Sequence, residues 1–121
     1  MTDQEIFDHV ASHLFTQGER AMSGIGCAYR GQNGTKCAVG CLIPDENYHP
    51  RMEKLPVGYR EVYSRLPFQV DDQTLALLRR LQTVHDARFP WVSTETMRQC
   101  LTEVAKDFDL TLNPELRFSD R

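Results

Sequence analysis

The spacing of apolar residues at the start of the chain predicts an amphipathic helix. Apolar side chains recur three and four residues apart in this segment, which places them on one helical face. Thr2 and Glu5 have the spacing of a capping box, and Gly18 is a typical C-terminal stop. We therefore expect a helix over about residues 2 to 17.

The second half of the chain repeats this pattern twice. Asp71 or Asp72 is expected to cap a second helix, whose leucine-rich stripe ends before Pro90. Ser93 or Thr94 is expected to start a third helix with one apolar face. The chain thus contains three predicted amphipathic helices.

The segment between the first two helices is rich in glycine and proline, which interrupt regular structure. Asn33-Gly34 favours a tight hairpin turn. Residues 35–43 suit a buried strand or a buried helical turn, and we favour a short helix that ends at Pro44. Residues 57–66 could hold about two further helical turns. The predicted fold class is mainly α (α+β at most), with a glycine/proline-rich insertion and at most a short β-hairpin.

The length of the chain indicates one small domain, residues 1–121. A chain of 121 residues buries roughly two-thirds of its unfolded surface, enough for one core. Residues 113–121 are polar and are expected to fray. The chain could also form homo-oligomers, because association would help a small core.

Charge and hydropathy exclude two classes of partner. The net charge is −3 and there is no basic run, so binding to nucleic acid is not expected. The longest uncharged apolar stretch, residues 37–44, is far shorter than a membrane span, so no membrane association is expected. The acidic N-terminal sequence does not resemble a secretory signal, and we expect a cytoplasmic protein with reduced cysteines.

The middle of the chain gathers side chains suited to ligand binding. Within residues 45–53 lie three carboxylates, a phenol, an imidazole and a guanidinium. Tyr29 and Arg30 add an aromatic face and a planar fork that recognises carboxylate or phosphate. This mixture suits a nucleotide-like ligand or the surface of a protein partner.

The cysteines permit a zinc hypothesis that their spacing does not favour. Cys27, Cys37 and Cys41 with His49 or His85 would supply sulfur and nitrogen ligands. Structural zinc sites usually contain two closely spaced cysteine pairs, and here only one pair is close in sequence. We therefore expect buried packing thiols, with no metal and no cofactor.

A second alternative is a cysteine-dependent enzyme. Cys37 could open a helix beside Lys36, which would lower its pKa, and His85 could act as its base. However, Asp86 points about 100° away from His85 on a helix, so we do not expect it to orient the imidazole. His85 also lies on the apolar stripe, where a buried, hydrogen-bonded histidine is the commoner case.

Two stretches of the chain carry a resemblance. Residues 27–48 (CAYRGQNGTKCAVGCLIPDENY) and 81–86 (LQTVHD) resemble a family of small proteins from phages, prophages and their bacterial hosts. The family has no established activity, and the resemblance implies a phage or prophage setting. The chain departs from the pattern at Lys54, where a glycine is expected.

The sequence thus predicts a non-enzymatic binding protein of phage type. By analogy, such a protein could counteract a bacterial defence system by binding a small nucleotide-like ligand or a bacterial protein. The candidate ligand-binding residues are Tyr29, Arg30, Lys36, Asp45, Tyr48, Glu53, His85 and Asp86.

Overall fold

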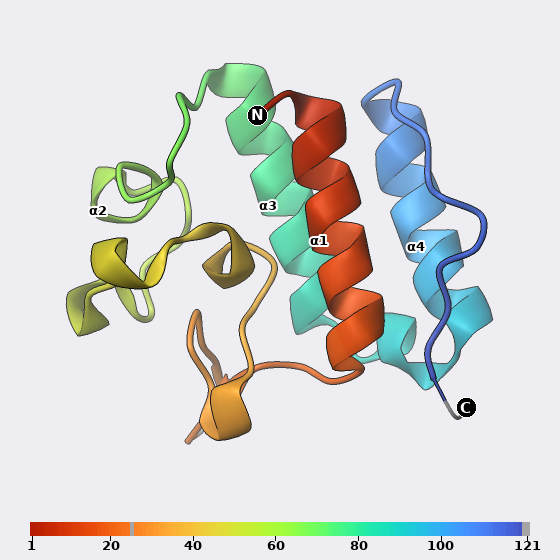
Figure 1. Cartoon of the computed structure of the whole chain (residues 1–121), viewed down its shortest axis with the longest axis horizontal. Coiled ribbons are helices and arrows are strands. Elements are labelled where there is room, and N and C mark those ends of the chain that lie inside the picture. Colours follow the sequence, from red (N-terminus) through yellow and green to blue (C-terminus); the bar gives the residue numbers. More distant parts are fainter. Residues whose placement is uncertain (25, 120–121) are drawn as a thin grey trace.

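Three long helices form the body of the protein. The computed structural model describes residues 1–24 and 26–119. Helices α1 (Asp3–Gln17), α3 (Asp72–Asp86) and α4 (Thr94–Asp107) lie side by side (Figure 1). The mainly α fold with a glycine/proline-rich insertion is confirmed.

Local capping explains where these helices begin. The Thr2 hydroxyl accepts the Glu5 backbone N–H, and the Glu5 carboxylate accepts the Thr2 N–H in return. Asp71 caps α3, and Ser93 caps α4, each by accepting the backbone N–H three residues later. Helix α1 ends at Gly18, which has a φ of 76°. The predicted starts of the three helices and the predicted end of α1 are confirmed to within a residue.

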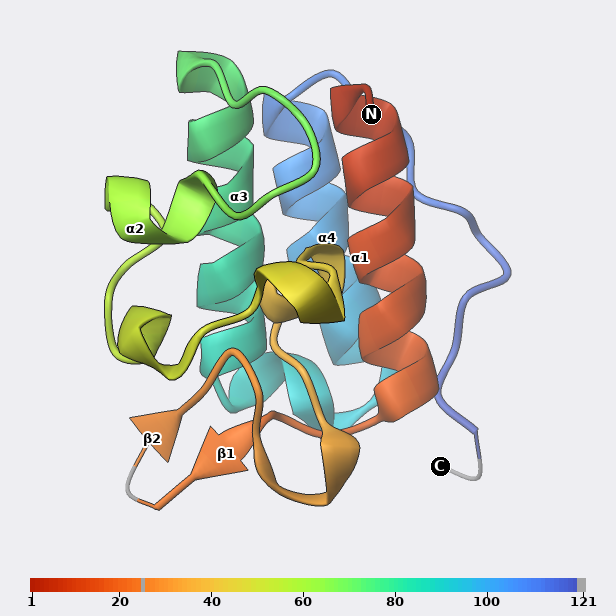
Figure 2. The ribbon, with the colours of Figure 1, turned by 60° about the vertical axis from the view of Figure 1, so that its left-hand side comes forward.

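The β-hairpin lies earlier in the chain than the Asn33-Gly34 turn. Strands β1 (Met22–Ser23) and β2 (Gly26–Cys27) pair antiparallel, below the helices in Figure 2. Asn33 and Gly34 do form a tight turn, with φ values of 60° and 74°. That turn is flanked only by an isolated bridge between residues 30 and 36, because the chain on either side soon diverges. The hairpin expected around it was therefore misplaced.

The rest of the insertion consists of single turns. Short 3-10 turns span Gly40–Leu42, Asp45–Asn47 and Pro50–Met52, and a further one, Phe89–Val92, joins α3 to α4. Helix α2 (Arg60–Tyr63) has four residues, shorter than the two turns expected there.

The helical interpretation of residues 35–43 is confirmed for residues 37–42, whereas Lys36 is extended and forms a β-bridge with Arg30. The Cys41 N–H donates to the Cys37 carbonyl at 3.0 Å, as in one turn of α-helix. Gly40 is required here, since a Cβ atom would lie 2.1 Å from the Tyr29 carbonyl oxygen. The turn is thus held directly against the backbone of the preceding segment.

One apolar core joins the bundle to the insertion. Met52 is fully buried although it belongs to a 3-10 turn, so the insertion packs onto the helices as part of the same domain. The helices contribute most of the fully buried side chains, among them Ile6, Phe7, Leu14, Leu77, Leu78, Leu81, Met97 and Leu101.

The C-terminal segment is packed, which corrects the expectation that residues 113–121 fray. Residues 109–118, here called the C-terminal strap, run along the outer side of α1 and α4 (Figures 1 and 2). Phe118 is 4% exposed, with its ring between those of Phe15 and Trp91. This aromatic anchor holds residues 113–118 in place, and residues 120–121 lie outside the described part.

None of the helices in the described part of the chain is both long enough and apolar enough to cross a membrane.

Candidate functional site

The predicted site residues gather in two groups, and the first is centred on Glu53. The Glu53 carboxylate accepts the backbone N–H of Tyr29 at 2.9 Å and that of Arg30 at 3.1 Å. It also accepts the Tyr48 hydroxyl at 2.7 Å. Glu53 thereby ties together two distant parts of the insertion.

Arg30 extends this group on its other side. Its guanidinium donates to Asp45 at 2.7 Å and to the Ile43 carbonyl at 2.9 Å, and it lies 4.8 Å from the centre of the Tyr48 ring. Lys36 lies 3.8 Å from the same Asp45 carboxylate. The hydrogen bond from Arg30 and the nearby Lys36 charge hold the pKa of Asp45 below its usual range.

The structure therefore brings together six predicted residues, but mostly in contact with one another. Their charges and hydrogen-bonding groups are largely used to hold turns of the insertion together. Tyr29 is buried, and its hydroxyl donates to the Leu55 carbonyl. This group, the Glu53 network, consists of Tyr29, Arg30, Lys36, Asp45, Tyr48 and Glu53.

The second group is centred on His85, which is fully buried as expected. Its Nε2 accepts the backbone N–H of Ala21 at 2.9 Å, and its Nδ1 lies 2.7 Å from Asp86 Oδ1. The expectation that Asp86 cannot orient His85 was wrong. Nδ1 is close to the point where the ring joins Cβ, so a carboxylate on the next residue can turn back to reach it.

These hydrogen bonds also settle where the imidazole carries its proton. A backbone N–H can only donate, so Nε2 accepts and the proton of neutral His85 is on Nδ1, from which it donates to Asp86. Burial by itself would raise the pKa of Asp86, but hydrogen bonds from His85 and Gln82 outweigh this effect and hold the pKa below its usual range.

Cys27, His85 and Asp86 offer ligand atoms within 4.8 Å of one another, but the geometry does not suit a metal. A metal on Nδ1 would displace the proton there, and moving it to Nε2 would set two N–H donors face to face at Ala21. Within the described residues Cys37 and Cys41 do not join this group, so the zinc set considered from the sequence is not assembled.

Cys37 also lacks the surroundings of a nucleophile. Its side chain accepts the Gly40 N–H at the start of a turn, but it is 1% exposed, and burial raises its pKa to about 12. Both ring nitrogens of His85 are already hydrogen-bonded, so neither is available as a base for the thiol. The arrangement does not favour a cysteine-dependent enzyme.

A groove of about 460 Å³ opens between the insertion and α3. Three segments form its walls: the chain that follows β2, the loop before α2, and the exposed side of α3. Its volume is within the usual range for small-molecule sites. The groove is lined by Cys27, Ala28, Tyr29, Cys37, Lys54, Leu55, Pro56, Val57, Arg79, Gln82, Thr83 and Asp86.

Two cations in this groove are unpaired. Neither the Lys54 nor the Arg79 side chain takes part in an ion pair or hydrogen bond among the described residues. Arg79 lies against Gly58, where a Cβ atom would come within 2.3 Å of its guanidinium. Lys54 has a φ of 68°, a left-handed conformation that favours glycine. The groove therefore offers two free positive charges beside an apolar loop.

Only two of the predicted site residues, Tyr29 and Asp86, line this groove. Sequence reasoning missed Arg79, Gln82 and Thr83, although a signal was present. With Asp86 they have the spacing i, i+3, i+4 and i+7, which places four polar side chains on one helical face. That face lies beside the leucine stripe and would have indicated a polar wall.

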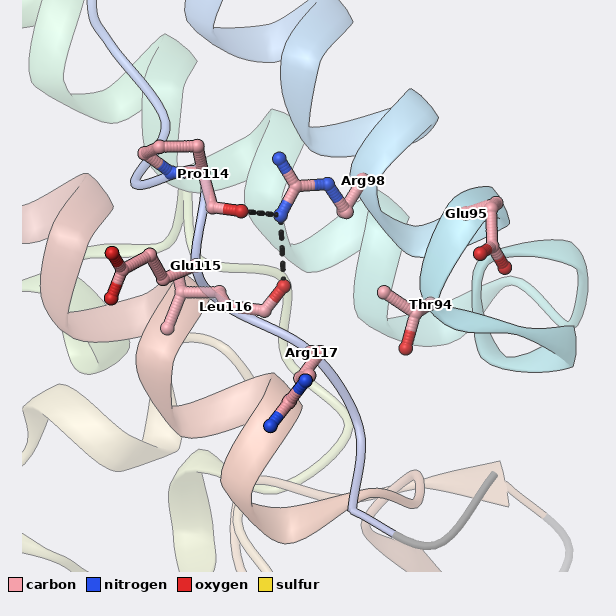
Figure 3. A pocket seen from close by; sticks show the side chains of 7 residues that line it. All are labelled: Thr94, Glu95, Arg98, Pro114, Glu115, Leu116 and Arg117. Atoms are coloured by element: carbon pink, nitrogen blue, oxygen red, sulfur yellow. Dashed lines mark hydrogen bonds between the residues drawn. The ribbon is translucent and has the colours of Figure 1, made fainter.

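Two further hollows differ in character, and only the first adjoins the groove. One of about 380 Å³ shares Cys27, Ala28 and Lys54 with the groove and also reaches Arg30, Tyr48 and Glu53. Another, of about 680 Å³, lies under the C-terminal strap, where Arg98 points at strap carbonyls and donates to Pro114 and Leu116 (Figure 3). Because Arg98 is already bonded to the strap, we consider the groove on α3 the better site.

Comparison of the chain with protein-family models, with curated proteins and with solved structures gives no match. The function of the groove is therefore argued from its geometry.

Proposed function

We propose that this protein is a non-enzymatic binding protein that captures a small, anionic, nucleotide-like ligand in the groove on α3. The observation that carries the proposal is the pair of unpaired cations, Lys54 and Arg79, in a groove about the size of a small-molecule site. A phosphate or carboxylate placed between them would gain charge-assisted hydrogen bonds.

The remaining lining suits the rest of such a ligand. Leu55, Pro56 and Val57 give an apolar wall against which a flat ring can pack. Gln82 and Asp86 add hydrogen-bonding groups at the α3 side, where the Asp86 side chain is 45% exposed. The combination of a charged rim, an apolar wall and a polar edge is typical of nucleotide recognition.

The phage setting implied by the sequence resemblance suggests a biological role for such binding. A protein that binds a bacterial nucleotide-like signal lowers its free concentration, which would counteract a defence system that depends on it. No bond is made or broken in this role. It requires only tight binding and enough copies of the protein.

Native mass spectrometry of the protein purified from bacteria, compared with its denatured mass, is the first test. We expect an excess of a few hundred daltons that disappears on denaturation, in keeping with one bound small molecule. Titration of the ligand-free protein with AMP by calorimetry then tests the class of ligand.

Matched variants locate the binding. Arg79→Ala is expected to weaken AMP binding about tenfold or more through loss of a charge-assisted contact. Arg80→Ala removes the same charge from the other side of α3, where Arg80 pairs with Asp107 at 2.7 Å, and should leave AMP binding unchanged. Equal effects of the two substitutions, or no AMP binding at all, would contradict the proposal.

A further inference from the structure

The groove on α3 adjoins a second hollow. The hollow of about 380 Å³ beside it, here called the second chamber, is lined by Ser23, Gly26, Cys27, Ala28, Arg30, Tyr48, Glu53 and Lys54. Cys27, Ala28 and Lys54 also line the groove, so the two cavities meet at these three residues. A ligand that passes over these residues would occupy both cavities.

Lys54 stands at this junction. Its side chain lines both cavities and has no ion-pair partner among the described residues. Its backbone adopts a φ of 68°, which is unfavourable for any residue that carries a Cβ atom. Strained backbone positions cluster at active sites and ligand-binding segments. The strained position carries a cation that lines both cavities.

The second chamber has its own features suited to a ring. The Arg30 guanidinium lies over the Tyr48 ring and presents a flat, cationic surface of the type on which nucleobases stack. Arg30 Nε is buried and has no hydrogen-bond partner among the described residues, so the surface that Arg30 offers to the chamber comes from the rest of its guanidinium. Glu53 is not a free charge here, because three hydrogen bonds engage its carboxylate.

From this arrangement we infer that the ligand is a dinucleotide-type molecule, with a phosphodiester or diphosphate group at Lys54 and one ring system in each chamber. The inference rests on the proposed function of the groove and specifies its ligand class. In this arrangement the phosphate group lies at Lys54, one nucleoside lies against Leu55 and Val57 in the groove, and the other nucleoside contacts Arg30 in the second chamber.

The test compares a probe that contains one nucleoside with a probe that contains two. AMP and the dinucleoside monophosphate ApA are titrated into the ligand-free full-length protein by calorimetry. ApA is expected to bind about tenfold more tightly than AMP, the effect of one additional stacked base. Diadenosine diphosphate serves as a second probe with two nucleosides, and its comparison with ApA distinguishes a diphosphate linkage from a phosphodiester linkage.

Variants of Ser23 and Lys54 test which part of the ligand each region of the two adjoining cavities binds. Ser23 is exposed and lines only the second chamber, so Ser23→Trp should fill that chamber and reduce ApA binding to the level of AMP. Ser12→Trp places the same side chain on an exposed position of α1 and is the matched control. Lys54→Gly should weaken both probes without lowering the melting temperature, since glycine relieves the backbone strain.

The outcomes distinguish a failure of the dinucleotide inference from a failure of the proposed function of the groove. If AMP and ApA bind equally, or if Ser23→Trp has no effect on ApA, the inference is wrong while the proposed function of the groove stands. If neither probe binds, both are wrong. A Lys54→Gly protein that binds both probes as well as the wild type would exclude a central anion at Lys54.

Discussion

The imidazole of His85, near the end of α3, accepts the backbone N–H of Ala21, the residue before β1, at 2.9 Å. Both groups are fully buried, and 64 residues separate them in the chain. The bond anchors the start of the insertion to the helix that forms one wall of the groove. It is a structural bond whose loss would leave a buried N–H without a partner.

We expect His85→Leu to lower the free energy of unfolding by about 2 kcal/mol more than His85→Gln, because glutamine can keep an acceptor for Ala21. Urea unfolding followed by circular dichroism measures the difference. Equal destabilisation by the two variants would mean that the hydrogen bond contributes little beyond packing.

The Glu53 network should behave as a stabilising element. Glu53→Ala removes the acceptor of two backbone N–H groups and the Tyr48 hydroxyl, and we expect a loss of about 3 kcal/mol in unfolding free energy. Glu46→Ala, at an exposed position of the neighbouring turn, should change stability by less than about 0.5 kcal/mol. A small effect of Glu53→Ala would instead mark the carboxylate as free for a ligand.

The cysteine thiols should be unreactive in the folded protein. Burial raises the pKa of all four thiols, that of Cys37 to about 12 and that of Cys41 further still. We expect slow, unselective alkylation by iodoacetamide at pH 7.5 and rapid reaction in urea, measured by intact mass and peptide mapping. Fast selective labelling of Cys37 would revive the cysteine-enzyme alternative.

Stability should decrease in mildly acidic solution because of His13. Burial lowers its pKa below the usual 6.5, so the unfolded chain takes up this proton at a higher pH than the folded one. The melting temperature should therefore fall as the pH drops below about 6.5 and the unfolded state gains its proton.

His13→Gln is the control for this effect. Glutamine can still donate to the Lys36 carbonyl, which His13 Nε2 contacts at 2.8 Å, but it does not titrate. The change in melting temperature between pH 7.5 and pH 5.5 should be smaller in the variant. An identical change would assign the acid sensitivity to groups other than His13.

The C-terminal strap should contribute measurably to folding. Phe118 packs against Phe15 and Trp91, and its N–H donates to the Thr94 hydroxyl at 3.0 Å. We expect Phe118→Ala to cost about 3 kcal/mol, whereas Arg117→Ala at the exposed neighbouring position should have little effect. Unfolding curves and the rate of trypsin cleavage within the strap provide the measurements. Equal behaviour of both variants would show that the strap is loosely held.

The sequence predicted the helices well because their signals are local. The capping box at Thr2, the caps at Asp71 and Ser93, and the apolar spacing between them act within a few residues. The same reasoning placed His85 in the core. It failed for the hairpin and for Phe118, whose burial depends on partners far away in the chain.

The candidate site was only partly predictable for the same reason. The sequence by itself determined that Tyr29, Arg30, Tyr48 and Glu53 lie in the insertion, with their polar groups available for some partner. Tertiary structure decided that these groups bond mainly to one another, because folding brings Glu53 to the backbone of residues 29 and 30. Tertiary structure also created the groove, because its walls come from segments that are far apart in the sequence. The distance between these segments in space cannot be derived from their spacing along the chain.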